Sequence, residues 1–588
     1  MKTSRTATWA ASALVTVGLA AGAFAGTAGA AEPGPGPAPP GPGAVATDTA
    51  AVTHAQNDRV PEGAAWTQHY FPSSDGSDTE LHADVLMPVG RAAGEKVPVI
   101  LAVSAYVGHS GQLVPEGFTH TGPSNRFADF MTGTDLFARG YAFVMVDTRG
   151  QGGSSGCLDF IGPGKQADVK AAIDWSAGQP WSTGSVGMYG KSYDAITGLI
   201  GNNLNQDALK AVVAQEPSWH PMRNFRSNGV PRTTIVEIPG VYAVSASIPQ
   251  MPDDDPRYLA NAAYETTHPD CIAEYKAGFR TGDPQSEYWK ARDLASLAKG
   301  SDTPLFATQG FLEWNTEAEA MQEFLDNHQG PERGWLGQWD HVRGNDRTDD
   351  GRLDMGREGW FAETMSFYDQ YLKGIAPPVQ YPAYAIQDST GTWRAQDTWP
   401  VVDGSATVAL GDGSYVDDAG APAAVNSFVT RSEPLKQAIR VTGTPRVSLS
   451  TEGSGNVMIK LYDVAPDGTA VMFDEQVSLL NSPETAFDLR STDWTLAADH
   501  SLAVEIGTIS PDVGPVPPTF SPGSDWLATP SLETIEVTDA ELDLALDNPA
   551  DDTATAGARS TYLDIYLAQR TKNLPVGPAT FTVPSDDR

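Results

Sequence analysis

The chain has 588 residues, and its 74 Asp and Glu outnumber its 38 Lys and Arg to give a formal net charge of −36. This balance argues against nucleic acid as a partner, because phosphate binding needs clustered basic side chains. Hydrophobic residues make up 40% of the chain, enough for a sizeable core, whereas two cysteines are too few for a disulfide framework or a four-cysteine zinc site. At about 100–200 residues per domain, the length predicts two to four packing units.

Residues 1–30 are predicted to be an export signal. Lys2 and Arg5 supply a positive start, residues 10–24 are rich in Ala, Val and Leu, and Ala28-Gly29-Ala30 resembles a cleavage site. A membrane anchor is the alternative, but the apolar run is short and contains many Gly and Ala. We therefore expect a secreted, extracellular protein that has no membrane association after cleavage.

A Pro/Gly-rich linker is predicted for residues 31–55, because this stretch offers almost nothing to bury. Export also affects the two cysteines, Cys157 and Cys271, which would meet an oxidising compartment. We expect them to pair, and two buried free thiols are the alternative.

The stretch from about 95 to 340 alternates continuous apolar runs with helical patterns. Continuous runs are typical of strands covered on both faces, as in a parallel sheet. They lie at 97–106, 141–147, 186–189, 209–214 and 304–308. The alternation predicts an α/β core in a domain spanning residues 56–378.

Two regions depart from this pattern. Residues from about 218 to 300 contain scattered aromatic side chains and predict an inserted, mostly helical cap. After about 380 the apolar period becomes two, as at 457–462, 502–506 and 563–567, with Gly, Pro and Asp between the segments. Half-buried strands of this kind predict an antiparallel β-sandwich, assigned to residues 379–588.

Ser192 is the candidate nucleophile. It lies in Tyr189-Gly190-Lys191-Ser192-Tyr193, between an apolar strand and an amphipathic helix. A Ser on a tight strand-to-helix turn presents its hydroxyl at the top of the sheet, near backbone N–H groups that stabilise an oxyanion. The full G-x-S-x-G pattern is not met, because Asp194 replaces the second glycine, and Gly-x-Ser alone also occurs by chance.

A Ser nucleophile needs a base and an orienting acid, which follow it in the chain order Ser, acid, His. His341 comes just after the strand-like run 334–340, although it could instead be a structural His stacked on Trp339. Glu313 lies just past the strand at 304–308 and is the candidate acid. Asp302 precedes that strand and Asp340 adjoins the His, so both are weaker candidates.

Several ordered motifs resemble the X-Pro dipeptidyl-peptidase and cocaine-esterase (CocE/NonD) family of α/β-hydrolases. The resemblance covers most of the mature chain. The motifs are Asp147-Thr148-Arg149-Gly150-Gln151-Gly152 with Ser155-Gly156, Asp174-Trp175, Gly190-Lys191-Ser192-Tyr193, Gly310 to Asn315, Trp339-Asp340-His341, and Leu461-Tyr462-Asp463-Val464-Ala465-Pro466-Asp467-Gly468.

The resemblance implies a catalytic triad of Ser192, Glu313 and His341. It also implies an oxyanion hole formed by the hydroxyl of Tyr106 and the backbone N–H of Tyr193, although Tyr106 could be an ordinary strand-end aromatic residue. The C-terminal domain is implied to be a jelly roll.

Several positions differ from the family pattern. The usual catalytic Asp is replaced by Glu313. Asn315 and Thr316 stand where some relatives that hydrolyse α-amino acid esters carry carboxylates for the substrate ammonium.

We therefore expect a serine hydrolase acting through an acyl-enzyme on a peptide or another small molecule, most similar to an X-Pro dipeptidyl-peptidase. A carboxylesterase of the cocaine-esterase type is the alternative, and a non-catalytic secreted binding protein on a hydrolase scaffold is the second. No metal or organic cofactor is expected. An acidic stretch at 346–357 imitates part of a calcium loop but ends in Arg357 instead of the bidentate Glu. The sequence carries no indication of oligomeric state.

Overall fold

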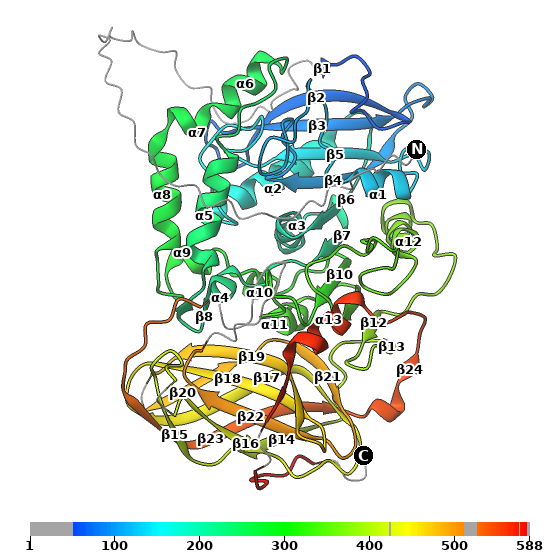
Figure 1. Cartoon of the computed structure of the whole chain (residues 1–588). Helices are drawn as coiled ribbons and strands as arrows, with labels where there is room; N and C mark the ends of the chain where they lie inside the picture. The colour runs from blue at the N-terminus through cyan, green and yellow to red at the C-terminus, as the bar shows by residue number, and fades with distance from the viewer. Residues whose placement is uncertain (1–50, 423–424, 482, 511–525, 575–576, 585–588) are drawn as a thin grey trace, which may run out of the picture.

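The computed structural model of the chain describes residues 51–422, 425–481, 483–510, 526–574 and 577–584. The predicted export signal and most of the predicted linker, up to residue 50, lie outside the described residues. The described chain begins inside the predicted linker, where β1 (Val52–Thr53) already pairs with the next strand. Figure 1 shows a layered α/β unit with a β-sandwich packed beneath it.

A twelve-stranded sheet forms the centre of the α/β unit. From β5 to β12 in spatial order neighbouring strands run parallel, whereas the strands at both ends of the sheet are antiparallel. The remaining strands in spatial order are β2 (Ala64–Pro72), β3 (Glu80–Pro88), β5 (Ala142–Asp147), β4 (Val97–Ser104), β6 (Ser182–Lys191), β7 (Leu209–Gln215), β10 (Leu305–Gly310), β11 (Glu332–Gly337), β12 (Tyr384–Gln387), β13 (Trp393–Gln396) and β24 (Thr553–Ala554). The continuous apolar runs of the sequence are thus its central strands.

Helices cover both faces of this sheet. Neighbouring residues of β4 point to opposite faces of the sheet. Leu101 lies in the hydrophobic core that includes residues of α2 and α3, whereas Ile100 lies in the core that includes residues of α1 and α12. These helices are α1 (Ala128–Gly133), α2 (Pro163–Gly178), α3 (Tyr193–Leu204) and α12 (Trp360–Lys373), and α11 (Met321–Asn327) packs against α10 near the end of β10. Full coverage explains why the parallel strands carry apolar side chains on both faces.

The region between β7 and β10 forms the predicted helical cap. Its helices lie along one side of the main sheet, on the left in Figure 1. They are α4 (Pro221–Phe225), α5 (Thr234–Ser245), α6 (Pro256–Ala262), α7 (Tyr264–Thr267), α8 (Pro269–Phe279), α9 (Glu287–Lys290) and α10 (Leu294–Leu297), with a small hairpin of β8 (Arg226–Ser227) and β9 (Val230–Pro231). None of the helices within the described residues combines the length and the apolar character needed to cross a membrane.

Two antiparallel sheets form the C-terminal sandwich, as the alternating apolar pattern predicts. One sheet contains β14 (Gly404–Ala409), β15 (Gly413–Val416), β17 (Ile439–Glu452), β20 (Glu484–Asp488), β21 (Thr492–Leu496) and β23 (Thr534–Asp547). The other contains β16 (Ser427–Arg431), β18 (Asn456–Val464), β19 (Thr469–Leu479), β22 (Ser501–Gly507) and β25 (Thr571–Asn573). Their inward side chains share one hydrophobic core. The finer assignment as a jelly roll stays a prediction.

The strand expected at 563–567 is wrong, because these residues lie in helix α13 (Thr561–Arg570). The Ser560 side chain caps this helix by accepting a hydrogen bond from the backbone N–H of Leu563. Leu563 and Tyr566 are buried on one side, at helical spacing, whereas Ile565 is 46% exposed. Three alternating residues are too few to separate a period of two from a helical period.

The main sheet also continues beyond the boundary predicted at 378/379. Strands β12 and β13 follow that boundary. Strand β24, which follows the sandwich strand β23 in sequence, pairs with β13. The predicted boundary is therefore too early for the sheet.

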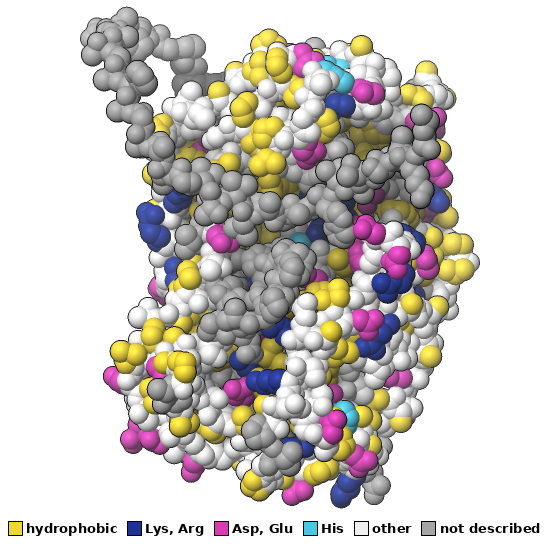
Figure 2. All heavy atoms as spheres, in the orientation of Figure 1, with side chains coloured by type: hydrophobic (Ala, Val, Ile, Leu, Met, Phe, Trp, Pro, Cys, Tyr) yellow, Lys and Arg dark blue, Asp and Glu magenta, His cyan; other side chains and the backbone are white. Residues whose placement is uncertain are grey.

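On the face shown in Figure 2, Lys and Arg side chains lie in small groups among Asp and Glu side chains.

Candidate active site

Ser192 lies on the turn between β6 and α3, in a backbone conformation with φ 63° and ψ −121°. Few non-glycine residues adopt a positive φ, and strain at such a turn is a feature of nucleophile positions. A Cβ at Gly190 would come within 2.3 Å of the backbone of Asp194, so only glycine fits there. The backbone N–H of Ser192 donates to the carbonyl of Gln215 at 2.8 Å, which fixes the turn against β7.

Asp194, which departs from the expected glycine, is buried in an ion pair. Its Oδ2 lies 2.5 Å from Nε of Arg126. The same guanidinium donates to the carbonyl of Lys191 at 3.1 Å and lies 4.4 Å from the ring centroid of Tyr106. Arg126 therefore links the Ser192 turn to the segment that carries Tyr106, and the Asp at 194 supplies its counter-ion.

Glu313 and His341, which come from loops after β10 and β11, lie in direct contact. Nδ1 of His341 is 2.8 Å from Oε1 of Glu313, whose side chain is fully buried. The carboxylate of Glu313 also accepts hydrogen bonds from the backbone and hydroxyl of Thr316 and from Nε2 of Gln309, at 2.6 to 3.0 Å. The Glu313 side chain thus reaches the imidazole of His341, and the hydrogen bonds from Thr316 and Gln309 hold its carboxylate in place.

The pKa values of Glu313 and His341 both lie below their usual values. Burial would raise the pKa of Glu313, but His341 and the hydrogen bonds from Thr316 lower it to about 2. Burial and the nearby Lys191 cation lower the pKa of His341, against the opposing effect of Glu313. The ring of His341 is therefore neutral at neutral pH and lies beside an ionised carboxylate.

Lys191 connects the Ser192 turn with the His341 loop. Its Nζ donates to the backbone carbonyl of His341 at 3.1 Å. Burial lowers the pKa of Lys191 to about 8. Among the described residues, no hydrogen bond joins the hydroxyl of Ser192 to the ring of His341, and such bonds often tighten only when substrate binds. The structure thus brings Glu313 and His341, the candidate acid and base, into contact, and Lys191 joins the His341 loop to the turn of the candidate nucleophile Ser192.

Glu216, just after β7, is a second buried carboxyl group that the sequence analysis missed. It accepts hydrogen bonds from the backbone of Gly310 at 2.9 Å and from the indole of Trp339 at 3.0 Å. Burial and the neighbouring Glu313 raise its pKa well above the usual range. Glu216 therefore ties together the two loops that carry Glu313 and His341. The sequence feature that could have identified Glu216 is its position directly after an apolar strand.

The two candidate oxyanion donors lie in an aromatic cluster. The hydroxyl of Tyr106 is hydrogen-bonded to that of Tyr242 in the cap at 2.5 Å, and the rings of Tyr106 and Tyr193 are 5.5 Å apart. Burial raises the pKa of Tyr106 to about 12, which keeps its hydroxyl a neutral donor. The backbone N–H of Tyr193 opens α3, where helix N–H groups have no intrahelical acceptor.

Cys157 and Cys271 form a disulfide, with their Cα atoms 5.0 Å apart. The bridge joins the loop between β5 and α2 to α8 of the cap. It therefore fastens the cap to the α/β unit.

A parallel sheet covered by helices, with Ser192 on a strained strand-to-helix turn and an acid–His pair after two later strands, defines an α/β-hydrolase. The model of the family described as "X-Pro dipeptidyl-peptidase (S15 family)" matches residues 75–343, a range that includes Ser192, Glu313 and His341. This part of the chain is therefore similar to the S15 family, and the similarity supports a hydrolase.

Relatives of both kinds are similar to the chain. A Bacillus anthracis protein named "Putative Xaa-Pro dipeptidyl-peptidase" is 24% identical over 437 residues, which are 64% of this chain and 68% of the relative. The cocaine esterase of Rhodococcus sp. is 21% identical over 481 residues, 63% of this chain and 80% of the relative. A solved CocE/NonD family hydrolase from Staphylococcus aureus shares the fold with a TM-score of 0.59 at 15% identity, covering 82% of this chain and 94% of that one.

Proposed function

We propose that the chain is a secreted serine hydrolase that cleaves peptide or ester bonds through an acyl-enzyme, with X-Pro peptides that have a free N-terminus as its substrate class. The contact between the buried Glu313 carboxylate and the ring of His341, beside the strained turn of Ser192, supports this proposal most strongly. The N-terminal pattern at 1–30 and the Cys157–Cys271 disulfide support export, because disulfides persist in oxidising compartments.

The proposed reaction follows from the roles of these groups. His341 removes the proton of the Ser192 hydroxyl as its oxygen bonds to the substrate carbonyl carbon. The hydroxyl of Tyr106 and the N–H of Tyr193 stabilise the oxyanion. His341 then protonates the departing amine or alcohol, and the acyl group remains on Ser192. Water, deprotonated by the same imidazole, attacks this ester and releases the acid.

The surroundings of Ser192 suit an apolar substrate group. The rings of Tyr106, Tyr193 and Tyr242 pack together, and Phe160 lies beside Tyr193 and Tyr242. A prolyl ring can pack against aromatic rings of this kind, as can the acyl group of an ester. The family name supports the peptidase, which is an argument by analogy.

A carboxylesterase is the second candidate. It is favoured because the acidic side chains of the cap already have hydrogen-bond partners within the chain. An exopeptidase must hold a substrate ammonium, but Asp253, Asp254 and Glu265 already accept hydrogen bonds from groups of this chain. The ammonium would therefore need another anchor. An ester substrate has no such requirement.

Labelling with an organophosphonate ester tests the mechanism. We expect one adduct per chain on Ser192 and none in Ser192→Ala, which should lose turnover of an activated aryl ester while it stays folded. Ser176→Ala, in the buried face of α2, is the matched control and should be labelled like the wild type. A folded wild-type chain that forms no adduct would favour the non-catalytic binding protein.

Substrate preference is tested with an X-Pro amide, its N-blocked form and a simple aryl ester. The peptidase proposal predicts at least tenfold higher kcat/KM for the free than for the blocked amide. Preference for the blocked amide would contradict it, and rapid ester hydrolysis without amide cleavage would establish the esterase instead.

A further inference from the structure

A buried cluster of His and Asp side chains lies outside the catalytic triad. His82 and Asp84 come from β3, where residues two apart share a face, and His109 comes from the loop after β4. Each side chain is at most 1% exposed. One potential ligand atom from each residue lies within 4.8 Å of those of the other two.

The distances within this cluster leave room for an ion. Nε2 of His109 is 3.2 Å from Oδ2 of Asp84, and Nε2 of His82 is 3.7 Å from Oδ1 of the same carboxylate. Ligand atoms bound about 2.0–2.2 Å from a tetrahedral zinc ion are roughly 3.4 Å apart. A direct charge-assisted hydrogen bond would be shorter, at about 2.7–2.9 Å. Nε2 of His109 is within hydrogen-bond distance of both Asp84 oxygens, at 3.2 and 3.3 Å, so the spacing matches a hydrogen bond as well as the edge of a coordination polyhedron.

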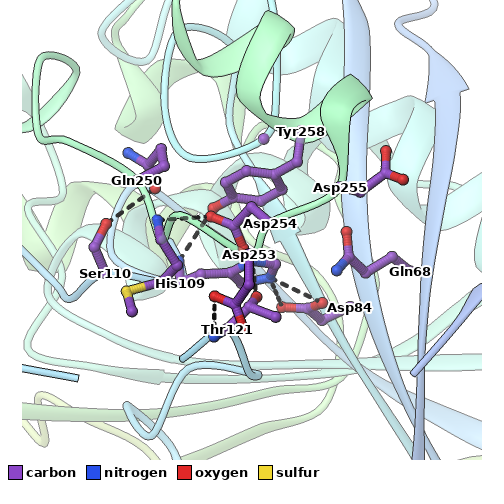
Figure 3. Close-up of polar contacts among 12 residues, drawn as sticks. Gln68, Asp84, His109, Ser110, Thr121, Gln250, Asp253, Asp254, Asp255 and Tyr258 are labelled. Atoms are coloured by element: carbon purple, nitrogen blue, oxygen red, sulfur yellow. Dashed lines mark hydrogen bonds and ion pairs between the residues drawn. The ribbon is translucent and has the colours of Figure 1, made fainter. Parts of the chain in front are cut away.

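Carboxylates on the far side of both imidazoles fix their orientation. Nδ1 of His82 is 2.8 Å from Asp147, and Nδ1 of His109 is 2.7 Å from Asp254. Figure 3 shows His109 between Asp84 and Asp254. Metal-binding histidines characteristically donate their second ring N–H to a carboxylate, because this fixes the tautomer that leaves the other nitrogen free to bind. Nε2 of each ring therefore faces Asp84.

Two further observations favour a cation at this place. Nε2 of His82 is buried and, within the described residues, forms no hydrogen bond. A buried nitrogen without a partner costs free energy that a bound ion would recover. Moreover, no Lys or Arg in the described part of the chain forms an ion pair with Asp84, Asp147 or Asp254. Without an ion, the positive charge beside these carboxylates would have to come from protonated histidines, of which His109 lies between Asp84 and Asp254.

We propose that His82, Asp84 and His109 bind one divalent transition-metal ion of the zinc type, whose remaining position is taken by water. His109 follows Tyr106 by three residues, and its ring stacks on Tyr258 of the cap at 4.2 Å. Asp254, which orients His109, lies two residues before the start of α6. The ion therefore holds the Tyr106 loop between β3 and the cap, as a structural site and not as a reactant.

Metal analysis of the purified full-length chain is the first test. We expect close to one zinc-type ion per chain after desalting. A chelator-treated sample should recover thermal stability on addition of Zn²⁺. With Co²⁺ it should develop the visible absorption of a low-coordinate site.

Variants at the ligands give the second test. Asp84→Asn and His82→Gln should bind Co²⁺ at least tenfold more weakly. The control is His328→Gln, a buried His that contacts Glu332 and Thr303 elsewhere in the fold, and it should bind Co²⁺ like the wild type.

Several results would overturn the proposal. A wild-type chain with less than one tenth of an ion, and with no response of its melting temperature or spectrum to Zn²⁺ or Co²⁺, would show that protons alone occupy the cluster. Stabilisation by Ca²⁺ but not by Zn²⁺ would contradict the choice of ion. If the ligand variants fail to fold, the measurements on the wild type decide.

Discussion

The His341 ring is subject to opposing electrostatic influences. The Glu313 carboxylate favours its protonated form, whereas burial and the Lys191 ammonium disfavour it. The result is a ring whose pKa lies below the usual value and whose Nδ1 faces an ionised carboxylate. Both consequences can be tested at single side chains.

Replacing Glu313 with Gln should lower kcat by about 10³–10⁴-fold, because an amide can hold the ring in the wrong tautomer and cannot stabilise the imidazolium. The measurement is turnover of an activated aryl ester at pH 7. Glu313→Asp keeps the charge on a shorter side chain and should retain more activity than the Gln variant. Equal activity of Gln and wild type would exclude Glu313 as the orienting acid.

Replacing Lys191 with Met should move the acid limb of the kcat/KM profile to higher pH. The ammonium lowers the pKa of His341, so its removal raises that pKa, and the base then becomes protonated at a higher pH. Lys191 has a pKa of about 8 and is therefore charged over the acid limb. Lys191→Arg preserves the charge and should leave the limb in place. An unchanged limb in the Met variant would show that the ammonium has no influence on the base.

Among the elements, the cap depends on its covalent attachment. The disulfide fastens α8 to the loop after β5 and closes a separation of 114 residues. The double variant Cys157→Ser/Cys271→Ser should lose about 2–5 kcal/mol of stability. Chemical denaturation of the variant, compared with wild type, measures this loss. Reduction of the wild type by dithiothreitol should reproduce it, and a wild type insensitive to reduction would contradict a structural role for the bridge.

The elements also show what the sequence could predict. Continuous apolar runs marked the central strands because burial on both faces removes polar residues from them. Helix α13 was mistaken for a strand because three alternating apolar residues satisfied both periods. The antiparallel strands of the sandwich carried a clear alternation and were recognised.

Within the site, Ser192, Glu313 and His341 could be chosen because each follows a predicted strand, and a parallel sheet brings such positions to one edge. The link from Asp194 through Arg126 to Tyr106 left no local pattern. Pairing partners that are dozens of residues apart are set by the tertiary fold, so a single sequence does not reveal them.

At the scale of the whole molecule, buried ion pairs join the sandwich to the loop after β10. Arg490 lies 3.3 Å from Asp474 within the sandwich, 3.8 Å from Glu317 of that loop, and 3.9 Å from the ring centroid of Trp314. The sandwich thus supports the segment that carries Glu313.

Arg490→Ala should cost about 3–5 kcal/mol, because it removes a guanidinium from two buried carboxylates. Chemical denaturation measures this loss, and activity should fall in parallel as the Glu313 loop loosens. The control is Arg446→Ala, which breaks an exposed pair with Asp488 and should cost less than about 1 kcal/mol. Equal effects of the two variants would contradict a supporting role for the buried pairs.

Strand β24 gives the main sheet its last edge from residues 553–554, which follow most strands of the sandwich in sequence. A fragment that stops before residue 553 still contains Ser192, Glu313 and His341 but lacks the segment that covers β13. Such a fragment presents an unpaired strand edge, which is a template for self-association. Fragments of this kind should therefore aggregate instead of acting as small hydrolases.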